Sequence, residues 1–480
     1  YLDNPTFRGM RQSLMKTFDE IYILDLHGNS LKRETTPDGG KDENVFDIRQ
    51  GVAIVLIIKN YFEKSIKHLD VYGKRINKYL LLNNNDFRSL NYQAIEPKSP
   101  FHFFIPRLTD DIQYYKKWLS VTNVFPLYFS GIVTARDKFV TSFSRKELQM
   151  RIMQFRDLSI PDNIISETYG IKDTKTWKMS HARKNLAEDP NWETYYKKIL
   201  YRPFDIRYIY YIPIMIARGR EESMFHMLKE NLGLLFTRPS KPMYEFSVFV
   251  SNNIVDQCVV GKKSAGAGNS YIAPLFKYPD NDQKDLFSLL DNEKEINISE
   301  EILAAMNIRY KIQPSSQNIF NYIYGVFYSN SYREKYAEYL KVDFPRVPFT
   351  SDYDTFIQIS EMGKRLLNLH LLLSPELNNP SAKFQGQSEE TVINIQQFIK
   401  AKQRVYINND FYFEGISPEV WGYQIGGYQV MYKYLKDRKG RRMDDPRHYI
   451  HISTAIEKTI EIQEEIDAIY PEVEKDLIEF

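Results

Sequence analysis

Apolar side chains near the start of the chain have the spacing of an amphipathic helix, and strand-like runs follow them. Four of these side chains recur every three or four residues: Phe7, Met10, Leu14 and Phe18. This spacing predicts a helix with one face packed on a sheet. The apolar runs at 21–26 and 51–59 have strand length, and we expect the second strand to be buried on both faces. We therefore predict that residues 1–75 are an α/β remnant. This segment has too few helices and strands to cover its own sheet.

The pattern changes twice along the rest of the chain. Residues 76–291 mix helices with short β-like runs at 101–106, 124–133, 206–212, 232–237 and 246–250. Residues 292–480 have mainly helical spacing, at 296–310, 317–340, 356–373 and 446–469. The polar stretch 278–292 predicts a joint between these two regions. The overall expectation is an α+β protein with an N-terminal α/β remnant, a mixed α/β middle region and a mostly helical C-terminal region.

Composition narrows the class of protein only slightly. The 480 residues carry 64 basic and 62 acidic side chains, a formal net charge of +2 that neither requires nor excludes a nucleic-acid partner. The single cysteine, Cys258, excludes an internal disulfide framework, and we interpret it as an inert packed thiol. No apolar stretch approaches the ~20 residues of a membrane span. We therefore expect a cytoplasmic protein with no membrane partner.

Three motifs suggest chemistry that their context does not support. The sequence PDNDQKD at 279–285 lacks the carboxylates on adjacent strands that a metal-dependent nuclease needs. The sequence KKSAGAGNS at 262–270 lacks the GxxxxGK[ST] order of a phosphate-binding P-loop and is better explained as a flexible loop. His448 and His451 lack further ligands, so a solvated helix face is the better interpretation. We predict no catalytic residue and no metal site.

Two basic clusters surround glycines and are more informative. Arg218 and Arg220 flank Gly219 in IARGR, and cations surround Gly440 in KDRKGRR at 436–442. Arginine on such loops can form paired hydrogen bonds with phosphates or guanine edges. Solvated surface charge is the alternative, and it is the better explanation when each cluster is considered alone.

Several segments together resemble the gamma-class N6-adenine DNA methyltransferases of bacterial restriction-modification systems, specifically the type ISP and related single-chain enzymes. Segments 4–30 and 41–59 resemble a helix, a loop and strands that follow the catalytic strand of that fold. Other segments resemble the target-recognition part of the same enzymes: YRPFDIR at 201–207, residues 319–340, FPRVP at 344–348 and residues 421–442. The resemblance implies that residues 1–75 are the end of a methyltransferase domain, that 76–291 are a mixed α/β target-recognition domain, and that 292–480 are its helical part.

The chain departs from that family at the positions that carry catalysis. The Asn/Asp-Pro-Pro-aromatic tetrapeptide that holds the adenine amino group is missing, as is the glycine-rich turn that binds S-adenosylmethionine. We expect both to precede Tyr1, in an N-terminal catalytic half of the same polypeptide. The chain alone is then inactive and binds no cofactor, whereas the parent is an adenine-specific DNA methyltransferase that uses S-adenosylmethionine and has a possible endonuclease. No base-stacking residue is assigned in GVAIVLIIK.

The resemblance favours double-stranded DNA as the partner of the basic clusters. Eight cations are predicted to lie on one DNA-facing surface: Arg218, Arg220, Lys262, Lys263, Arg438, Lys439, Arg441 and Arg442. Two alternatives stay open, a stand-alone DNA-specificity or scaffold subunit and the recognition part of an RNA methyltransferase.

Overall fold

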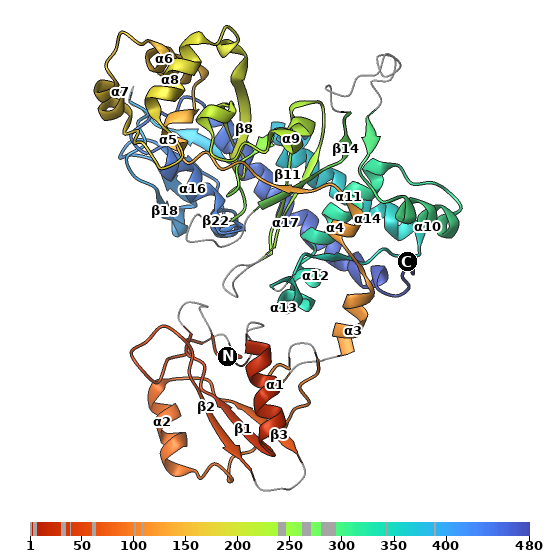
Figure 1. Ribbon diagram of the computed structural model, residues 1–480. Helices are drawn as coiled ribbons and strands as arrows, with labels where there is room; N and C mark the ends of the chain where they lie inside the picture. The colour runs from red at the N-terminus through yellow and green to blue at the C-terminus, as the bar shows by residue number, and fades with distance from the viewer. Residues whose placement is uncertain are drawn as a thin grey trace. The chain divides into compact units, whose positions relative to one another are not determined.

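The computed structural model divides the chain into two compact units, residues 1–117 and 118–480 (Figure 1). It describes residues 2, 7–29, 35–38, 40–59, 64–99, 102–106, 110–238, 246–261, 270–279, 294–341, 343–387 and 390–480. The predicted domain bounds 1–75, 76–291 and 292–480 stay predictions. The predicted joint falls mostly outside the described residues.

Unit 1 is built around a four-stranded sheet with the order β2-β1-β3-β4. Its elements are α1 (Arg8–Thr17), β1 (Glu20–Asp25), β2 (Ala53–Ile58), β3 (Ser65–Asp70), α2 (Arg75–Asn84), β4 (Gln93–Ala94) and α3 (Asp110–Lys117). Strand β1 runs parallel to β3 and antiparallel to β2. The helix predicted around residues 7–18 and the two strands predicted at 21–26 and 51–59 are therefore confirmed.

The prediction that the second strand is buried on both faces is wrong. Strand β2 lies at the edge of the described sheet, with β1 as its only strand neighbour there. Three of its apolar side chains, Ile54, Leu56 and Ile57, are 37–47% exposed. A continuous apolar run was interpreted as an interior strand, but an edge strand can carry the same sequence when nothing in its own unit covers it.

Unit 2 mixes helices with several small sheets, as the α+β prediction requires. Its longer helices are α6 (Arg145–Arg156), α7 (Asp162–Tyr169), α8 (Met179–Glu188), α10 (Glu300–Tyr310), α11 (Ser316–Tyr328), α12 (Asn330–Lys335), α14 (Tyr353–His370), α16 (Val430–Asp437) and α17 (Pro446–Val473). The short ones are α4 (Val121–Val124), α5 (Asp137–Val140), α9 (Glu221–Met224), α13 (Ala337–Leu340), α15 (Pro418–Gly422), η2 (Trp192–Tyr195), η3 (Pro213–Met215), η4 (Phe225–Leu228), η6 (Pro375–Asn378) and η7 (Lys400–Lys402).

The described strands of unit 2 form three four-stranded sheets and several pairs. The sheets have the orders β11-β10-β13-β6, β12-β8-β9-β7 and β17-β20-β19-β18. Their strands are β6 (Phe129–Ser130), β7 (Thr141–Ser142), β8 (Tyr196–Arg202), β9 (Asp205–Tyr210), β10 (Gly233–Thr237), β11 (Val248–Ser251), β12 (Ile254–Val255), β13 (Ser270–Pro274), β17 (Lys383–Gln385), β18 (Gln397–Ile399), β19 (Arg404–Tyr406) and β20 (Tyr412–Glu414). The pairs are β5 (Leu119–Ser120) with β16 (Arg346–Val347), β14 (Phe276–Lys277) with β15 (Glu295–Ile296), and β21 (Gln424–Ile425) with β22 (Tyr428–Gln429).

Three helices, α11, α14 and α17, form the core of unit 2 (Figure 1). Every residue from 319 to 328 in α11 is buried. His370 of α14 links the three helices, because one ring nitrogen lies 2.6 Å from the Tyr324 hydroxyl and the other 2.9 Å from the Thr459 hydroxyl. Burial lowers the pKa of His370 to about 3, so this imidazole is neutral at physiological pH.

For unit 2, three of the strands predicted from the sequence are confirmed, whereas one predicted helix and two predicted strand runs are wrong. The strands predicted at 206–212, 232–237 and 246–250 correspond to β9, β10 and β11. The helix predicted over 317–340 is instead three helices, because Ser329 ends α11 and its side chain accepts the Tyr332 N–H to start α12. The run 124–133 forms only the two-residue strand β6, and residues 102–106 form no strand.

None of the helices in the described part of the chain is long and apolar enough to cross a bilayer.

Close packing of α11 on α14 depends on two glycines. A side chain at Gly363 would collide with the Asn321 carbonyl, and one at Gly325 would lie 2.7 Å from the Ile359 carbonyl oxygen. Because these obstacles are backbone atoms, the helices must separate to admit a methyl group. We expect Gly363→Ala to lower the free energy of unfolding by about 1–3 kcal/mol, as overpacked cores do. Urea denaturation measures this change.

The matched control is Gly422→Ala at the end of α15, where an added methyl group meets no atom within 4 Å. Equal destabilisation by both substitutions would show that helix separation is not the cause.

Candidate nucleic-acid interface

The loop that carries Arg218 and Arg220 is anchored through its backbone. Arg218 exchanges two hydrogen bonds of 3.0 Å with Val133. The Tyr211 hydroxyl donates to the Gly219 carbonyl at 2.6 Å. Arg220, not the glycine, adopts the positive φ, at 60°, immediately before α9. Both arginine side chains are exposed, so an anchored backbone presents two cations to solvent.

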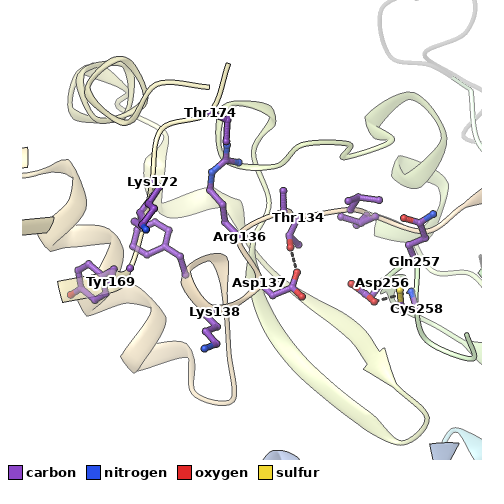
Figure 2. Close-up of a pocket in the computed structure, with 16 residues that line it drawn as sticks. Thr134, Arg136, Asp137, Lys138, Tyr169, Lys172, Thr174, Asp256, Gln257 and Cys258 are labelled. Carbon is purple, nitrogen blue, oxygen red and sulfur yellow. Dashed lines mark hydrogen bonds between the residues drawn. The ribbon is translucent and has the colours of Figure 1, made fainter. Parts of the chain in front are cut away.

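A cavity of about 710 Å³ lies beside Val133 (Figure 2). Three cations from two segments line it: Arg136, Lys138 and Lys172. The Arg136 guanidinium stacks 3.6 Å from the Trp177 ring centre and donates to the Met215 carbonyl at 3.2 Å. These contacts orient a half-buried positive charge toward the cavity wall, while the two lysines are exposed.

The acidic residues of this cavity have partners inside the protein. Asp256 pairs at 2.8 Å with Arg202, and both side chains are 5% exposed. Asp137 accepts hydrogen bonds from the hydroxyls of Thr134 and Tyr201. Burial raises the pKa of the Cys258 thiol to about 11, so the thiol is protonated at neutral pH. The charge that remains available in the cavity is therefore positive, which suits an anion.

The second basic cluster meets YRPFDIR, although the two motifs are more than 200 residues apart. The Arg438 guanidinium donates at 2.7 Å to Asp205 Oδ1, and the Arg207 guanidinium donates at 2.6 Å to Asp205 Oδ2. The Asp205 side chain is only 3% exposed and that of Arg438 is 14% exposed. Burial favours the neutral acid, but the two guanidinium groups outweigh it and lower the pKa of Asp205.

An aromatic ring joins the arginines of this cluster. Phe143 lies 4.2 Å from the Arg207 guanidinium, 4.5 Å from that of Arg438 and 4.8 Å from that of Arg441, measured to the ring centre. Arg441 also pairs at 3.1 Å with Glu147, but this pair is about 40% exposed. The cluster therefore contains one largely enclosed arginine, Arg438, and one exposed arginine, Arg441, from the same short segment.

The eight predicted DNA contacts have different surroundings. Arg218, Arg220, Lys439, Arg441 and Arg442 are exposed, whereas Arg438 is largely enclosed. Gly440 has a φ of 81° and donates its N–H to the Ile393 carbonyl, which fixes the turn between these cations. Lys262 and Lys263 lie outside the described residues. A single DNA-facing surface stays a prediction.

Sequence reasoning missed two features of this region. Nothing local marks Arg136, because its partner Trp177 is 41 positions away. His448 was interpreted as part of a solvated face, which is wrong, because its Nε2 lies 3.0 Å from the Phe204 carbonyl oxygen and the ring stacks on Tyr434. No local signal marks this contact, because Phe204 and His448 are 244 positions apart.

Comparison with protein families matches residues 123–465 to the type ISP C-terminal specificity domain. The chain belongs to this family. The matched residues include the anchored arginine loop, the cavity and the Asp205 cluster. A comparison with curated protein sequences finds no match.

Three solved structures share the fold of this type ISP family member. A DrdV–DNA complex has a TM-score of 0.66 and 22% identity, over 97% of this chain and 49% of that one. The ATP-dependent type ISP restriction-modification enzyme LlaBIII bound to DNA has a TM-score of 0.66 and 23% identity, over 97% and 32%. A nuclease-deletion mutant of the type ISP enzyme LlaGI with a DNA substrate mimic has a TM-score of 0.63 and 19% identity, over 97% and 38%. The chain thus spans half or less of each of these proteins.

The buried Asp205 cluster predicts a pH-dependent loss of stability. We expect Asp205→Asn to lower the free energy of unfolding by about 3–5 kcal/mol, because it leaves Arg438 without its carboxylate and Arg207 with Asp437 alone. The folded-state pKa of Asp205 lies below the unfolded value near 4. Its contribution is therefore fully present above pH ~5 and is lost as the pH falls through the folded-state pKa. Urea denaturation at several pH values should show the variant and wild type converging in acid.

Glu147→Gln is the matched control, since Glu147 also pairs with an arginine of KDRKGRR but is 39% exposed. We expect a change of about 0–1 kcal/mol, as for exposed ion pairs. If both variants lose the same stability, burial of Asp205 is not the cause.

Proposed function

We propose that this chain reads the target sequence of double-stranded DNA for a type ISP restriction-modification enzyme. The observation that carries this proposal is the family match to a specificity domain over residues 123–465. The fold shared with DrdV, LlaBIII and LlaGI, each in a structure with DNA or a DNA mimic, supports DNA as the partner. The exposed arginines and the cationic cavity of unit 2 supply groups suited to phosphates and base edges.

The parent protein, in this proposal, methylates adenine at N6 with S-adenosylmethionine as the methyl donor. Unit 1 then completes the edge of a methyltransferase sheet, and the catalytic half of the same polypeptide lies upstream. An adenine within a duplex must be flipped out before it can react, at a cost of a few kcal/mol. Unit 2 offsets that cost through its contacts with the DNA on either side of the target base.

The DNA contacts are assigned first to the anchored loop. Arg218 and Arg220 have exposed guanidinium groups on a backbone held by Val133, so binding requires little ordering of the loop. Lys138 and Lys172 at the neighbouring cavity extend the same positive region toward phosphates. Lys439, Arg441 and Arg442, together with Lys262 and Lys263, stay in the proposed set.

Arg438 has a different role in this proposal. Its guanidinium is held by the buried carboxylate of Asp205 and by the Tyr434 ring, 3.5 Å away. Removing it from Asp205 would leave a buried charge without its full compensation. Arg438 therefore positions the turn that carries Lys439, Arg441 and Arg442. It stays paired with Asp205 and does not contact DNA.

Two other functions share the fold. A stand-alone specificity or scaffold subunit would lack an upstream catalytic half, and the gene sequence before Tyr1 decides this point through the presence or absence of Asn-Pro-Pro-Tyr. The recognition part of an RNA methyltransferase would prefer RNA over DNA. Competition between duplex DNA and RNA of the same sequence therefore distinguishes this alternative from the proposed DNA recognition.

The loop arginines should affect both affinity and sequence choice. We expect Arg218→Ala or Arg220→Ala to weaken binding of the preferred duplex by about 1–3 kcal/mol and to broaden the preference at one position, if the side chain pairs with a guanine. An arginine that touches only phosphate would weaken all duplexes alike, and its loss would lower the salt slope by about one unit. Selection from a randomised duplex library, followed by titrations at several salt concentrations, distinguishes these results.

Arg309→Ala is the control, because Arg309 is an exposed arginine of unit 2 paired with Asp476 on a different part of the chain. The interface assignment fails if the loop variants bind the selected duplexes as tightly as this control does.

A further inference from the structure

The carboxyl ends of β1 and β3 bring two acidic side chains together in unit 1. The parallel register places Asp25 opposite Asp70, at the edge where open α/β sheets bind ligands. His27 follows β1, with its Nε2 2.8 Å from Asp70 Oδ1 and its Nδ1 3.9 Å from Asp25 Oδ1. One nitrogen or oxygen from each of the three side chains falls within 4.8 Å of the others.

The backbone fixes the imidazole of His27 in this position. His27 has a positive φ of 49°, which is uncommon for any residue other than glycine. Its N–H donates to Asp25 Oδ1 at 3.1 Å, and its ring stacks on Tyr72 with centres 3.9 Å apart. The next N–H, of Gly28, donates to the buried carboxylate of Asp42 at 2.6 Å. The loop therefore holds the ring against the two carboxylates, as a site that binds a ligand requires.

A fourth side chain points independently to a missing ligand. His68 of β3 is 1% exposed, and neither of its ring nitrogens has a hydrogen-bond partner among the described residues. Its Nδ1 lies 3.7 Å from Asp70 Oδ2, so the ring faces the same carboxylate that His27 contacts. Buried polar atoms normally have a partner, so this enclosed imidazole is a second observation that points to a ligand.

We propose that Asp25, His27 and Asp70 bind a divalent first-row transition-metal ion such as Zn²⁺, with the His68 imidazole beside the Asp70 carboxylate. Carboxylates and imidazole together are a common ligand set for Zn²⁺, whereas Mg²⁺ prefers oxygen ligands alone. The ion would tie the carboxyl end of β1 to that of β3 and fix the loop that follows β1. This site is independent of the proposed DNA recognition, which is assigned to unit 2.

The test is calorimetric titration of the full 480-residue chain with Zn²⁺ after removal of bound metals. We expect one saturable site in the wild type, with affinity at least tenfold weaker in His27→Ala and in Asp70→Asn. Asp25→Asn serves as a second isosteric variant if His27→Ala fails to fold, as judged by circular dichroism. A thermal shift gives an independent readout, because Zn²⁺ should raise the unfolding temperature of the wild type more than that of the variants.

Other histidines provide the matched controls. His181→Ala and His451→Ala remove imidazoles from unit 2 and should leave the affinity for Zn²⁺ unchanged. A tenfold molar excess of Mg²⁺ should not displace Zn²⁺. The proposal is overturned if the wild type shows no saturable Zn²⁺ binding, if binding survives unchanged in both Asp70→Asn and Asp25→Asn, or if either control variant abolishes it.

Discussion

The buried carboxylate of Asp205 is the constraint on which the organisation of unit 2 depends. It opens β9 and receives guanidinium groups from its own strand and from the end of α16, more than 200 residues later. A carboxylate without these partners would cost several kcal/mol to bury. The β8–β9 hairpin and the turn after α16 are therefore joined by buried charge, although they are more than 200 residues apart.

The β8–β9 hairpin also packs against the helical core of unit 2. Its turn places Phe204 at a positive φ of 61°, with the ring 5.2 Å from Phe249 and 5.7 Å from His370. A non-glycine residue in this conformation stores strain that the surrounding packing must offset. YRPFDIR thus joins the arginine cluster on one side to α14 on the other, and the loops around it start from a rigid frame.

The sequence predicted the elements with strong periodicity and failed where the outcome depends on distant partners. α1, β1, β9 and α14 could be located from their apolar spacing, because that spacing reflects the face each element buries. The exposure of β2 could not, because an apolar run does not reveal whether another layer covers it. The break at Ser329 was also hidden, since its hydroxyl donates to Asp467, 138 residues later.

Site residues followed the same rule. The glycine-flanked arginines were visible as a local pattern, whereas the Arg136–Trp177 stack and the Asp25–His27–Asp70 group were not. In the second group, His27 directly follows the strand predicted at 21–26. Asp70 lies 43 positions farther along, and only the parallel register of β1 and β3 makes it a neighbour. Contacts between residues so far apart cannot be detected from a local sequence pattern.

The arginines of KDRKGRR illustrate why charge alone does not identify a DNA contact. Arg441 shares its charge with Glu147 in a pair that water reaches, and such pairs contribute about 0–1 kcal/mol. A phosphate that replaced Glu147 would lose little of that energy and would gain the release of counterions. Arg438, three residues earlier, pairs with the Asp205 carboxylate, which is only 3% exposed. A phosphate cannot replace this carboxylate without leaving a buried charge unpaired. Burial of the acidic partner, not the number of arginines, therefore decides which cations of one short segment are available to a polyanion.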